Sequence, residues 1–73
     1  MPTQIVLDHS GDSRHTFDAS DADAVARAEA RFKELTSIGF TAATRRAAGE
    51  PVLVRKFDPS AEETLFFPRL VGG

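Results

Sequence analysis

The chain has 73 residues, six phenylalanines, no cysteine and a formal net charge of −2. A chain this short folds as one domain with a thin core, since it buries only about 60% of its unfolded surface. Without cysteine, the sequence excludes disulfides, thiolate metal sites and cysteine nucleophiles. The slightly acidic balance argues against general nucleic-acid binding, which needs several Lys or Arg side chains facing phosphates.

No stretch of the sequence has the pattern of a targeting or membrane segment. The first ten residues lack the basic segment and long apolar run of a signal peptide. No stretch approaches the roughly 18 apolar residues of a membrane span. The sequence therefore predicts a cytoplasmic protein with neither membrane nor nucleic-acid partners.

The chain opens with the pattern of a hairpin. Residues 3–8 alternate as a strand does, and residues 10–13 (Ser-Gly-Asp-Ser) are typical of a turn. Residues 14–18 predict the returning strand, with Phe17 as its core residue.

A helix is predicted over residues 21–38. Ser20 is a favourable N-cap, and Gly39 suits the position just after the last turn. Apolar residues recur at spacings of three and four and form one stripe: Ala22, Val25, Ala28, Phe32, Leu35 and Ile38.

After the helix the apolar pattern changes to a period of two. Residues 40–46 predict a third strand, and residues 52–57 predict a fourth strand at a sheet edge. Residues 58–63 have the N-cap, proline and acids of a helix start, with room for one or two turns. Residues 64–70 predict the last strand, with Leu65 and Phe67 opposite Phe66.

One helix with a full apolar stripe must pack on a sheet of four or five strands, which predicts an α+β roll over residues 1–73. A ferredoxin-like arrangement ranks second, because it needs a second helix of about ten residues or more.

The last eight residues, Phe66 to Gly73, form an apolar strand followed by Gly72-Gly73. Glycine has no Cβ, so a Gly-Gly end is thin enough for a narrow channel in another protein. It also leaves the terminal carbonyl open to attack. The residues before it can be gripped in extended form by a partner. The alternative is an ordinary flexible terminus made of small residues.

The order of elements and the Gly-Gly end resemble the β-grasp, ubiquitin-like superfamily, with order β-β-α-β-β-β and one helix on a mixed sheet. The tail resembles the bacterial sulfur carriers of molybdopterin synthesis, which end in Phe-x-Pro-Pro-hydrophobic-small-Gly-Gly. Phe66, Pro68, Leu70, Gly72 and Gly73 match that pattern.

Two tail positions depart from the sulfur-carrier pattern. Arg69 replaces the second proline and Val71 is larger than usual, which leaves room for another ubiquitin-like system. The pair Arg69-Leu70 is similar to the basic, leucine-rich tail of ubiquitin.

This resemblance implies a carrier or modifier rather than an enzyme. A partner of the ubiquitin-activating type would adenylate the carboxylate of Gly73 with ATP and magnesium, and the chain itself would bind no cofactor. The acyl group would then pass to sulfur as a thiocarboxylate, or through a thiol to a lysine of an acceptor protein. Gly72 and Gly73 would be the activated end, and the partner would bind Phe66, Pro68, Arg69, Leu70 and Val71.

Two other clusters carry competing interpretations. Asp8, His9, Asp12 and His15 have metal-ligating side chains, but a solvated polar turn explains them more simply. A Ser-His-Asp triad is discounted there, since a two-stranded turn offers no buried orienting acid.

The second cluster is basic. Four cations on the third and fourth strands could form, with Arg69, a basic face for an acidic partner, or could simply protect a sheet edge: Arg45, Arg46, Arg55 and Lys56. One of Phe66 and Phe67 could be an exposed anchor for a partner while the other is core.

Two alternatives to the carrier follow from the same sequence. The chain could be a β-grasp interaction module, such as a small subunit of a larger complex with an inert tail. It could also be an adaptor that binds peptides along the strand 52–57.

Overall fold

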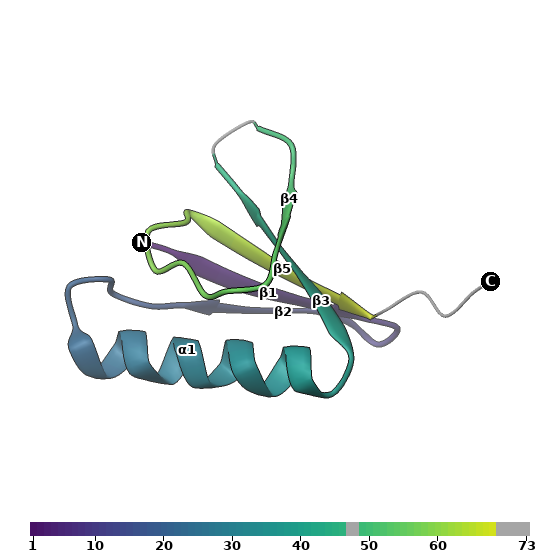
Figure 1. Ribbon diagram of the computed structural model, residues 1–73, viewed down its shortest axis with the longest axis horizontal. Coiled ribbons are helices and arrows are strands. Elements are labelled where there is room, and N and C mark those ends of the chain that lie inside the picture. Colours follow the sequence, from purple (N-terminus) through teal and green to yellow (C-terminus); the bar gives the residue numbers. More distant parts are fainter. Residues whose placement is uncertain (47–48, 69–73) are drawn as a thin grey trace.

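The computed structural model describes residues 1–46 and 49–68, and in them one helix packs on one face of a five-stranded sheet (Figure 1). This confirms the predicted α+β class and the predicted order of elements along the chain. In chain order these are β1 (Thr3–Asp8), β2 (Gly11–Thr16), α1 (Ala22–Ser37), β3 (Phe40–Arg45), β4 (Val52–Val54) and β5 (Glu63–Pro68).

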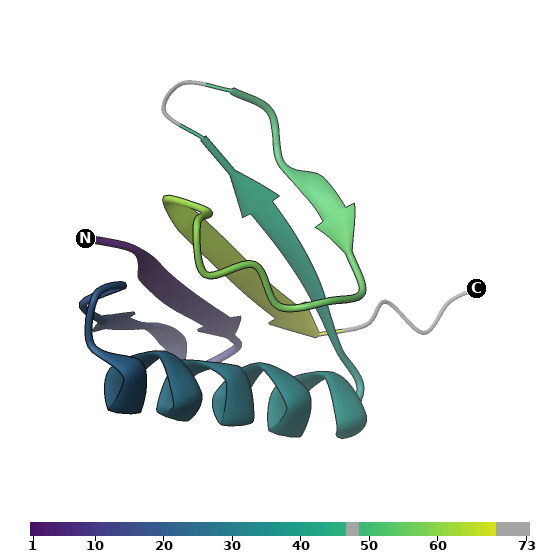
Figure 2. The ribbon, with the colours of Figure 1, turned by 60° about the vertical axis from the view of Figure 1, so that its left-hand side comes forward.

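The sheet is mixed, and its strand order is β2-β1-β5-β3-β4. The pair β1–β5 is parallel, whereas β1–β2, β3–β5 and β3–β4 are antiparallel. The last strand in the sequence is thus the central strand in space, and it joins the two hairpins. Figure 2 shows α1 lying along one face of this sheet, where it connects β2 to β3.

The first hairpin turns more tightly than the sequence predicted. Strand β2 begins at Gly11 and pairs with Asp8, so only two residues separate the strands. The reversal is stabilised by Asp8, whose Oδ1 accepts hydrogen bonds from the backbone N–H (2.8 Å) and hydroxyl (2.6 Å) of Ser10. Gly11 takes a φ of +129°, a conformation that residues with a Cβ rarely adopt. The prediction of a turn over residues 10–13 was therefore wrong.

The N-cap of helix α1 lies one residue later than predicted. Asp21, rather than Ser20, is the N-cap, and its carboxylate accepts from the backbone N–H groups of Asp23 (3.0 Å) and Ala24 (3.3 Å). Ser20 instead donates to Asp18 in a turn that precedes the helix. At the other end the helix stops before Gly39, whose φ of +109° confirms its predicted place after the last turn.

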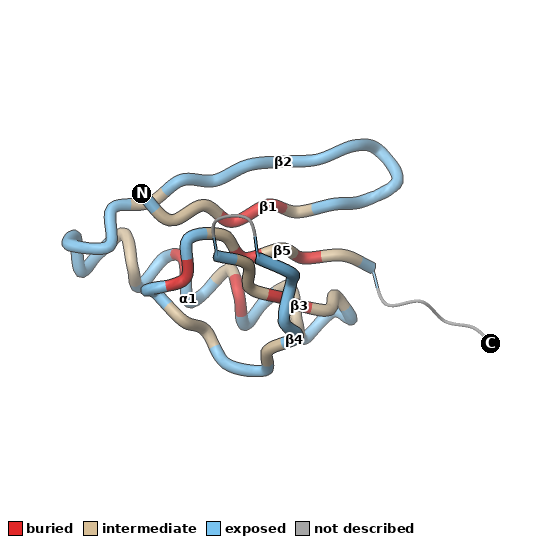
Figure 3. The backbone as a smooth tube through the Cα atoms, turned by 90° about the horizontal axis from the view of Figure 1, so that it is seen from above, coloured by how far each residue is buried: buried red, intermediate tan, exposed pale blue. Residues whose placement is uncertain are grey.

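The core lies between α1 and the central strands. Ala28 and Phe32 are the buried helix residues, whereas the two ends of the predicted stripe, Ala22 and Ile38, are exposed. Phe32 packs edge-on against Phe66 of β5 with ring centroids 5.7 Å apart. Figure 3 shows the buried residues gathered on β1, β5, β3 and the facing side of α1, while β2 is exposed along its length. The aromatic part of the core therefore fills the helix side of the sheet's centre, while Ile5 and Ala43 are buried on the other face.

Phe17 lies after β2 rather than within it, and it is half-buried. Its ring contacts that of Phe57, which in turn contacts Phe32 (centroids 6.1 and 6.0 Å apart). The prediction that Phe17 faces the core from a strand was wrong, although its ring still extends the aromatic cluster.

Strand β4 is shorter than predicted, and the predicted helical turn before β5 is absent from the described residues. The strand ends at Val54, and the chain then bends through residues 55–62. Asp58 Oδ1 accepts from the backbone N–H (2.9 Å) and hydroxyl (2.6 Å) of Ser60, and Ala61 N–H donates to the Asp58 carbonyl (3.2 Å). This turn takes the place of a helix because the Asp58 side chain binds the backbone two residues on.

Candidate functional site

Strand β5 is the element from which the predicted tail departs. It is hydrogen-bonded to β1 on one side and to β3 on the other, with Ile5 opposite Leu65 and Phe40 opposite Pro68. A strand paired on both sides cannot slide without breaking two ladders, so the position of Pro68 is fixed by the sheet. Since β5 is parallel to β1, Pro68 lies at the end of the sheet away from the N-terminus of β1 (Figure 1).

The structure places the predicted tail contacts unequally. Phe66 is fully buried beneath α1, so its side chain belongs to the core and not to a partner surface. Phe67 is half-buried on the opposite face, and Pro68 is exposed. The remaining predicted residues, Arg69, Leu70, Val71, Gly72 and Gly73, lie outside the described residues.

The face of the sheet without the helix carries a row of apolar side chains. Ile5, Leu65, Ala43 and Leu53 are cross-strand neighbours in β1, β5, β3 and β4. Ile5 is only 3% exposed although no helix covers it, while Leu53 at the sheet edge is 69% exposed. Within the described residues, then, this row is buried at Ile5 and Ala43, half-buried at Leu65 and open to solvent at the sheet edge, at Leu53.

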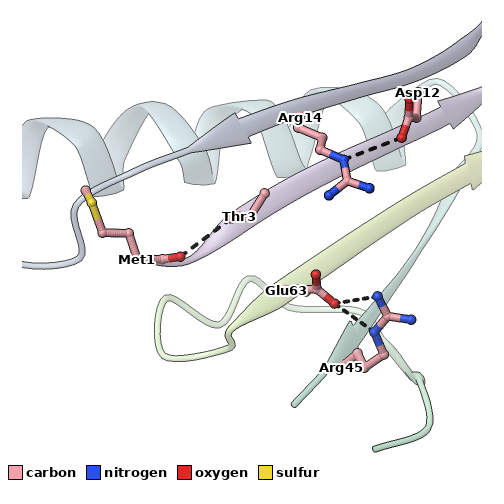
Figure 4. A network of polar contacts seen from close by, with 6 residues as sticks. All are labelled: Met1, Thr3, Asp12, Arg14, Arg45 and Glu63. Atoms are coloured by element: carbon pink, nitrogen blue, oxygen red, sulfur yellow. Dashed lines mark hydrogen bonds and ion pairs between the residues drawn. The ribbon is translucent and has the colours of Figure 1, made fainter. Parts of the chain in front are cut away.

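Two ion pairs flank this apolar row (Figure 4). Arg45 of β3 contacts Glu63 of β5 through both Nε (2.7 Å) and Nη2 (2.6 Å). On β2, Arg14 lies 3.5 Å from Asp12. Such half-exposed pairs contribute little to stability, about 0–1 kcal/mol, and serve mainly to fix the polar border of the face.

The predicted basic face is not assembled as one surface. Arg45 is paired with Glu63 on the helix-free face. Arg55 and Lys56 lie in the bend after β4, where they line a groove together with α1. The antiparallel register separates these cations: Val52 pairs with Thr44 and Val54 with Ala42, so the chain runs away from Arg45 before it reaches Arg55 and Lys56.

The polar turn between β1 and β2 offers no metal centre. In the described part of the chain, no group of three or more His, Asp or Glu side chains is placed to hold an ion. The pKa of Asp8 is lowered because its carboxylate accepts the hydroxyl and backbone hydrogen bonds of Ser10. The cluster of Asp8, His9, Asp12 and His15 is thus interpreted as a turn held by an Asp-Ser contact.

A buried glutamine is the feature that sequence reasoning missed. Gln4 of β1 is fully buried; its amide donates to the carbonyl of Ala28 (2.9 Å), and its oxygen accepts from Arg31 Nη1 (3.1 Å). A polar residue in a strand with alternating pattern is normally placed on the solvent side. Only the position of the helix shows that Gln4 joins α1 to the sheet.

The helix in the described residues is neither long nor apolar enough to cross a membrane. Comparison of the chain with protein-family models, with curated proteins and with solved structures finds no match.

Proposed function

We propose that this chain is a β-grasp, ubiquitin-like carrier or modifier that acts through the carboxylate of Gly73. The observation that carries the proposal is the place of β5: the final strand is the central one, held by β1 and β3, and the sequence runs from its exposed end at Pro68 to Gly72-Gly73. A β-grasp arrangement is compatible with the mixed sheet, its strand order and the single helix of the described residues.

The scaffold suits a carrier because it fixes the starting point of the tail. Five residues follow Pro68, and fully extended they span up to about 17 Å. That length is enough for the end to reach a recessed site while the folded domain stays outside. Glycine at the last two positions removes the side chains that a narrow channel would exclude.

The chemistry would be performed by a partner of the ubiquitin-activating type. A carboxylate oxygen of Gly73 would attack the α-phosphorus of ATP, and pyrophosphate would leave. The partner would supply the site for ATP and its magnesium. Attack of hydrosulfide on the acyl carbon, with AMP leaving, would give a thiocarboxylate for biosynthesis. Attack of a thiolate of the partner, again with AMP leaving, would give a thioester that passes the acyl group to a lysine amine and releases the thiol.

The proposal is tested by intact mass spectrometry after incubation with ATP, magnesium and a lysate of the source organism. Exchange of one oxygen for sulfur identifies a sulfur carrier, and an adduct through the terminus identifies a conjugated modifier. A variant lacking Gly73 is expected to show neither product, whereas Leu53→Lys, with an intact tail, is expected to show the same product as the wild type. An unmodified wild-type chain in a lysate with active adenylating enzymes would overturn the proposal.

A second function is favoured by the apolar row on the helix-free face. In this alternative the chain is an interaction module, or a small subunit, that docks through Leu53 and Leu65 onto an apolar surface of another protein. An apolar row that opens to solvent at one end and has a polar border is compatible with a protein contact. The two functions separate in one pull-down: Leu53→Lys would abolish capture of the partner, and removal of Gly73 would leave it intact.

A further inference from the structure

A groove lies between α1 and the bend that follows β4, and neither β5 nor the helix-free face contributes a residue to its lining. Its volume is about 300 Å³. Four residues of one helix stripe and three consecutive residues of the bend line it: Glu29, Phe32, Lys33 and Thr36, with Arg55, Lys56 and Phe57.

The groove has an aromatic floor. Phe32 is 3% exposed and belongs to the core, and the half-buried ring of Phe57 lies edge-on to it with centroids 6.0 Å apart. The hydroxyl of Thr36 donates to the carbonyl of Phe32 (2.9 Å) and is therefore already occupied. The bottom of the groove thus offers carbon surface rather than hydrogen-bonding groups.

The groove has a cationic rim. Lys33 rises from the helix, and Arg55 and Lys56 rise from the bend, against the single carboxylate of Glu29. The ion pairs found in the described ranges are Arg14–Asp12 and Arg45–Glu63, so none of these three cations is neutralised by a carboxylate there. Like charges held on one rim repel one another, and an anionic ligand would relieve that repulsion.

We propose that this groove binds a short acidic segment of a partner protein, with one apolar side chain on the Phe57–Phe32 floor and carboxylates on either side. The volume lies at the lower limit of ligand pockets, which span roughly 300–1,000 Å³, and so suits one side chain better than a nucleotide. Lys33 and Arg55 come from opposite walls of the groove, so carboxylates on both sides of the apolar residue meet a cation. This recognition uses no residue of the tail, so it does not depend on the chemistry proposed for Gly73.

The test uses a labelled peptide, acetyl-Asp-Glu-Phe-Glu-Asp-amide, titrated into the intact chain and followed by NMR amide shifts and fluorescence anisotropy. A ligand with one anchor is expected to bind with a Kd on the order of 0.1–1 mM. The shifted amides are expected over residues 29–36 and 55–57. Replacing the peptide's Phe by Ala should weaken binding about tenfold, and replacing its acids by Lys should abolish it.

Matched charge reversals locate the site. Lys33→Glu is expected to raise the Kd of the peptide about threefold to tenfold, and the double variant Lys33→Glu with Arg55→Glu should raise it further. Arg27→Glu is the control, since it makes the same change on an exposed helix residue that does not line this groove. Raising NaCl from about 20 to about 300 mM should weaken the wild-type complex because rim charges are screened.

Three results would overturn the proposal. The first is no binding at millimolar peptide, and the second is equal weakening by Lys33→Glu and Arg27→Glu. The third is sedimentation with vesicles of anionic phospholipid, lost in Lys33→Glu, while the peptide fails to bind. That last result would assign the groove to a lipid surface instead.

Discussion

The two faces of the sheet are built from the same strands, yet they are used differently. On the helix side, Val6, Phe66 and Ala42 form a cross-strand row that is closed by α1. On the other side, the neighbouring row of Ile5 and Leu65 continues to an exposed edge at Leu53 and is bordered by ion pairs.

The difference teaches that the helix decides where the aromatic core forms, whereas Ile5 and Ala43 are buried on the other face without it. Both rows are apolar, so neither has the polar pattern that normally marks the solvent side of an antiparallel sheet. Gln4, the one amide at the centre of the sheet, lies on the covered side and is hydrogen-bonded to the helix. The exposed end of the second row, at Leu53, is available for contact with another molecule.

The largest contrast is expected between two adjacent phenylalanines. Phe66→Ala removes a fully buried ring and should cost about 3–5 kcal/mol, a large share of the roughly 4–11 kcal/mol expected for a domain of this size. Phe67→Ala makes the same change on the helix-free face, where the ring is half-buried, and should cost less than half as much. Urea unfolding followed by far-UV circular dichroism measures both, and equal losses would contradict the assignment of faces.

The sequence was sufficient for the order of elements but not for the choice of face. Alternation alone placed Phe66 opposite Leu65 and Phe67, which the structure confirms. It did not indicate which side α1 covers, because both sets are apolar. Knowledge of that side comes from the path of the helix between β2 and β3, which is a long-range property.

The predictions for the turns were wrong although the sequence contains a local pattern that marks them. The pattern Asp-x-Ser occurs three times, at Asp8, Asp18 and Asp58, and in each case the aspartate accepts two hydrogen bonds from the serine two residues on. Interpreting these aspartates as turn formers would have shortened the predicted turn of the first hairpin and removed the predicted helical turn before β5. The predicted tail contacts from Arg69 onward stay predictions, since they lie outside the described residues.

The buried amide provides the second test of the covered face. Gln4→Ala should cost about 2–3 kcal/mol, because it leaves a cavity and removes both the bond to Ala28 and the bond from Arg31. Gln4→Leu keeps the volume and leaves the half-exposed Arg31 free to reach water, so its cost should stay near 1 kcal/mol. The same urea titration measures the free energy of unfolding of both variants. A leucine variant as unstable as the alanine variant would show that the hydrogen bonds of Gln4 contribute more than its packing.

Acid should lower the stability of the domain first through the turns, where the carboxylates of Asp8, Asp18 and Asp58 accept hydrogen bonds. The pKa values of Asp8, Asp18 and Asp58 are each lowered from 3.8, first by the serine hydroxyl and then by the serine backbone N–H. A carboxyl with a lowered folded-state pKa stabilises the fold above its unfolded value and loses that contribution as pH falls through the folded value. The urea midpoint should therefore decline below about pH 4.

The variant with all three aspartates changed to Asn tests this account. Asn retains an oxygen that accepts from the serine N–H but has no charge to lose, so the decline in the urea midpoint should flatten. The variant should be less stable than the wild type near neutral pH and differ less from it in acid. An unchanged slope would mean that carboxyls elsewhere govern acid sensitivity.

The smallest effect on stability is expected on the helix-free face, and it is the most informative about function. Leu53→Lys alters a side chain that is 69% exposed on an edge strand, so the free energy of unfolding should change by less than about 0.5 kcal/mol. Ile38→Lys is the matched control: Ile38 is 66% exposed, but it lies at the end of α1. If the open row is a contact surface, proteins that wild-type chain captures from lysate should be lost with Leu53→Lys and retained with Ile38→Lys. Equal retention by both variants would mean that exposure on this face has no role in binding, and the tail would then remain the surface to examine.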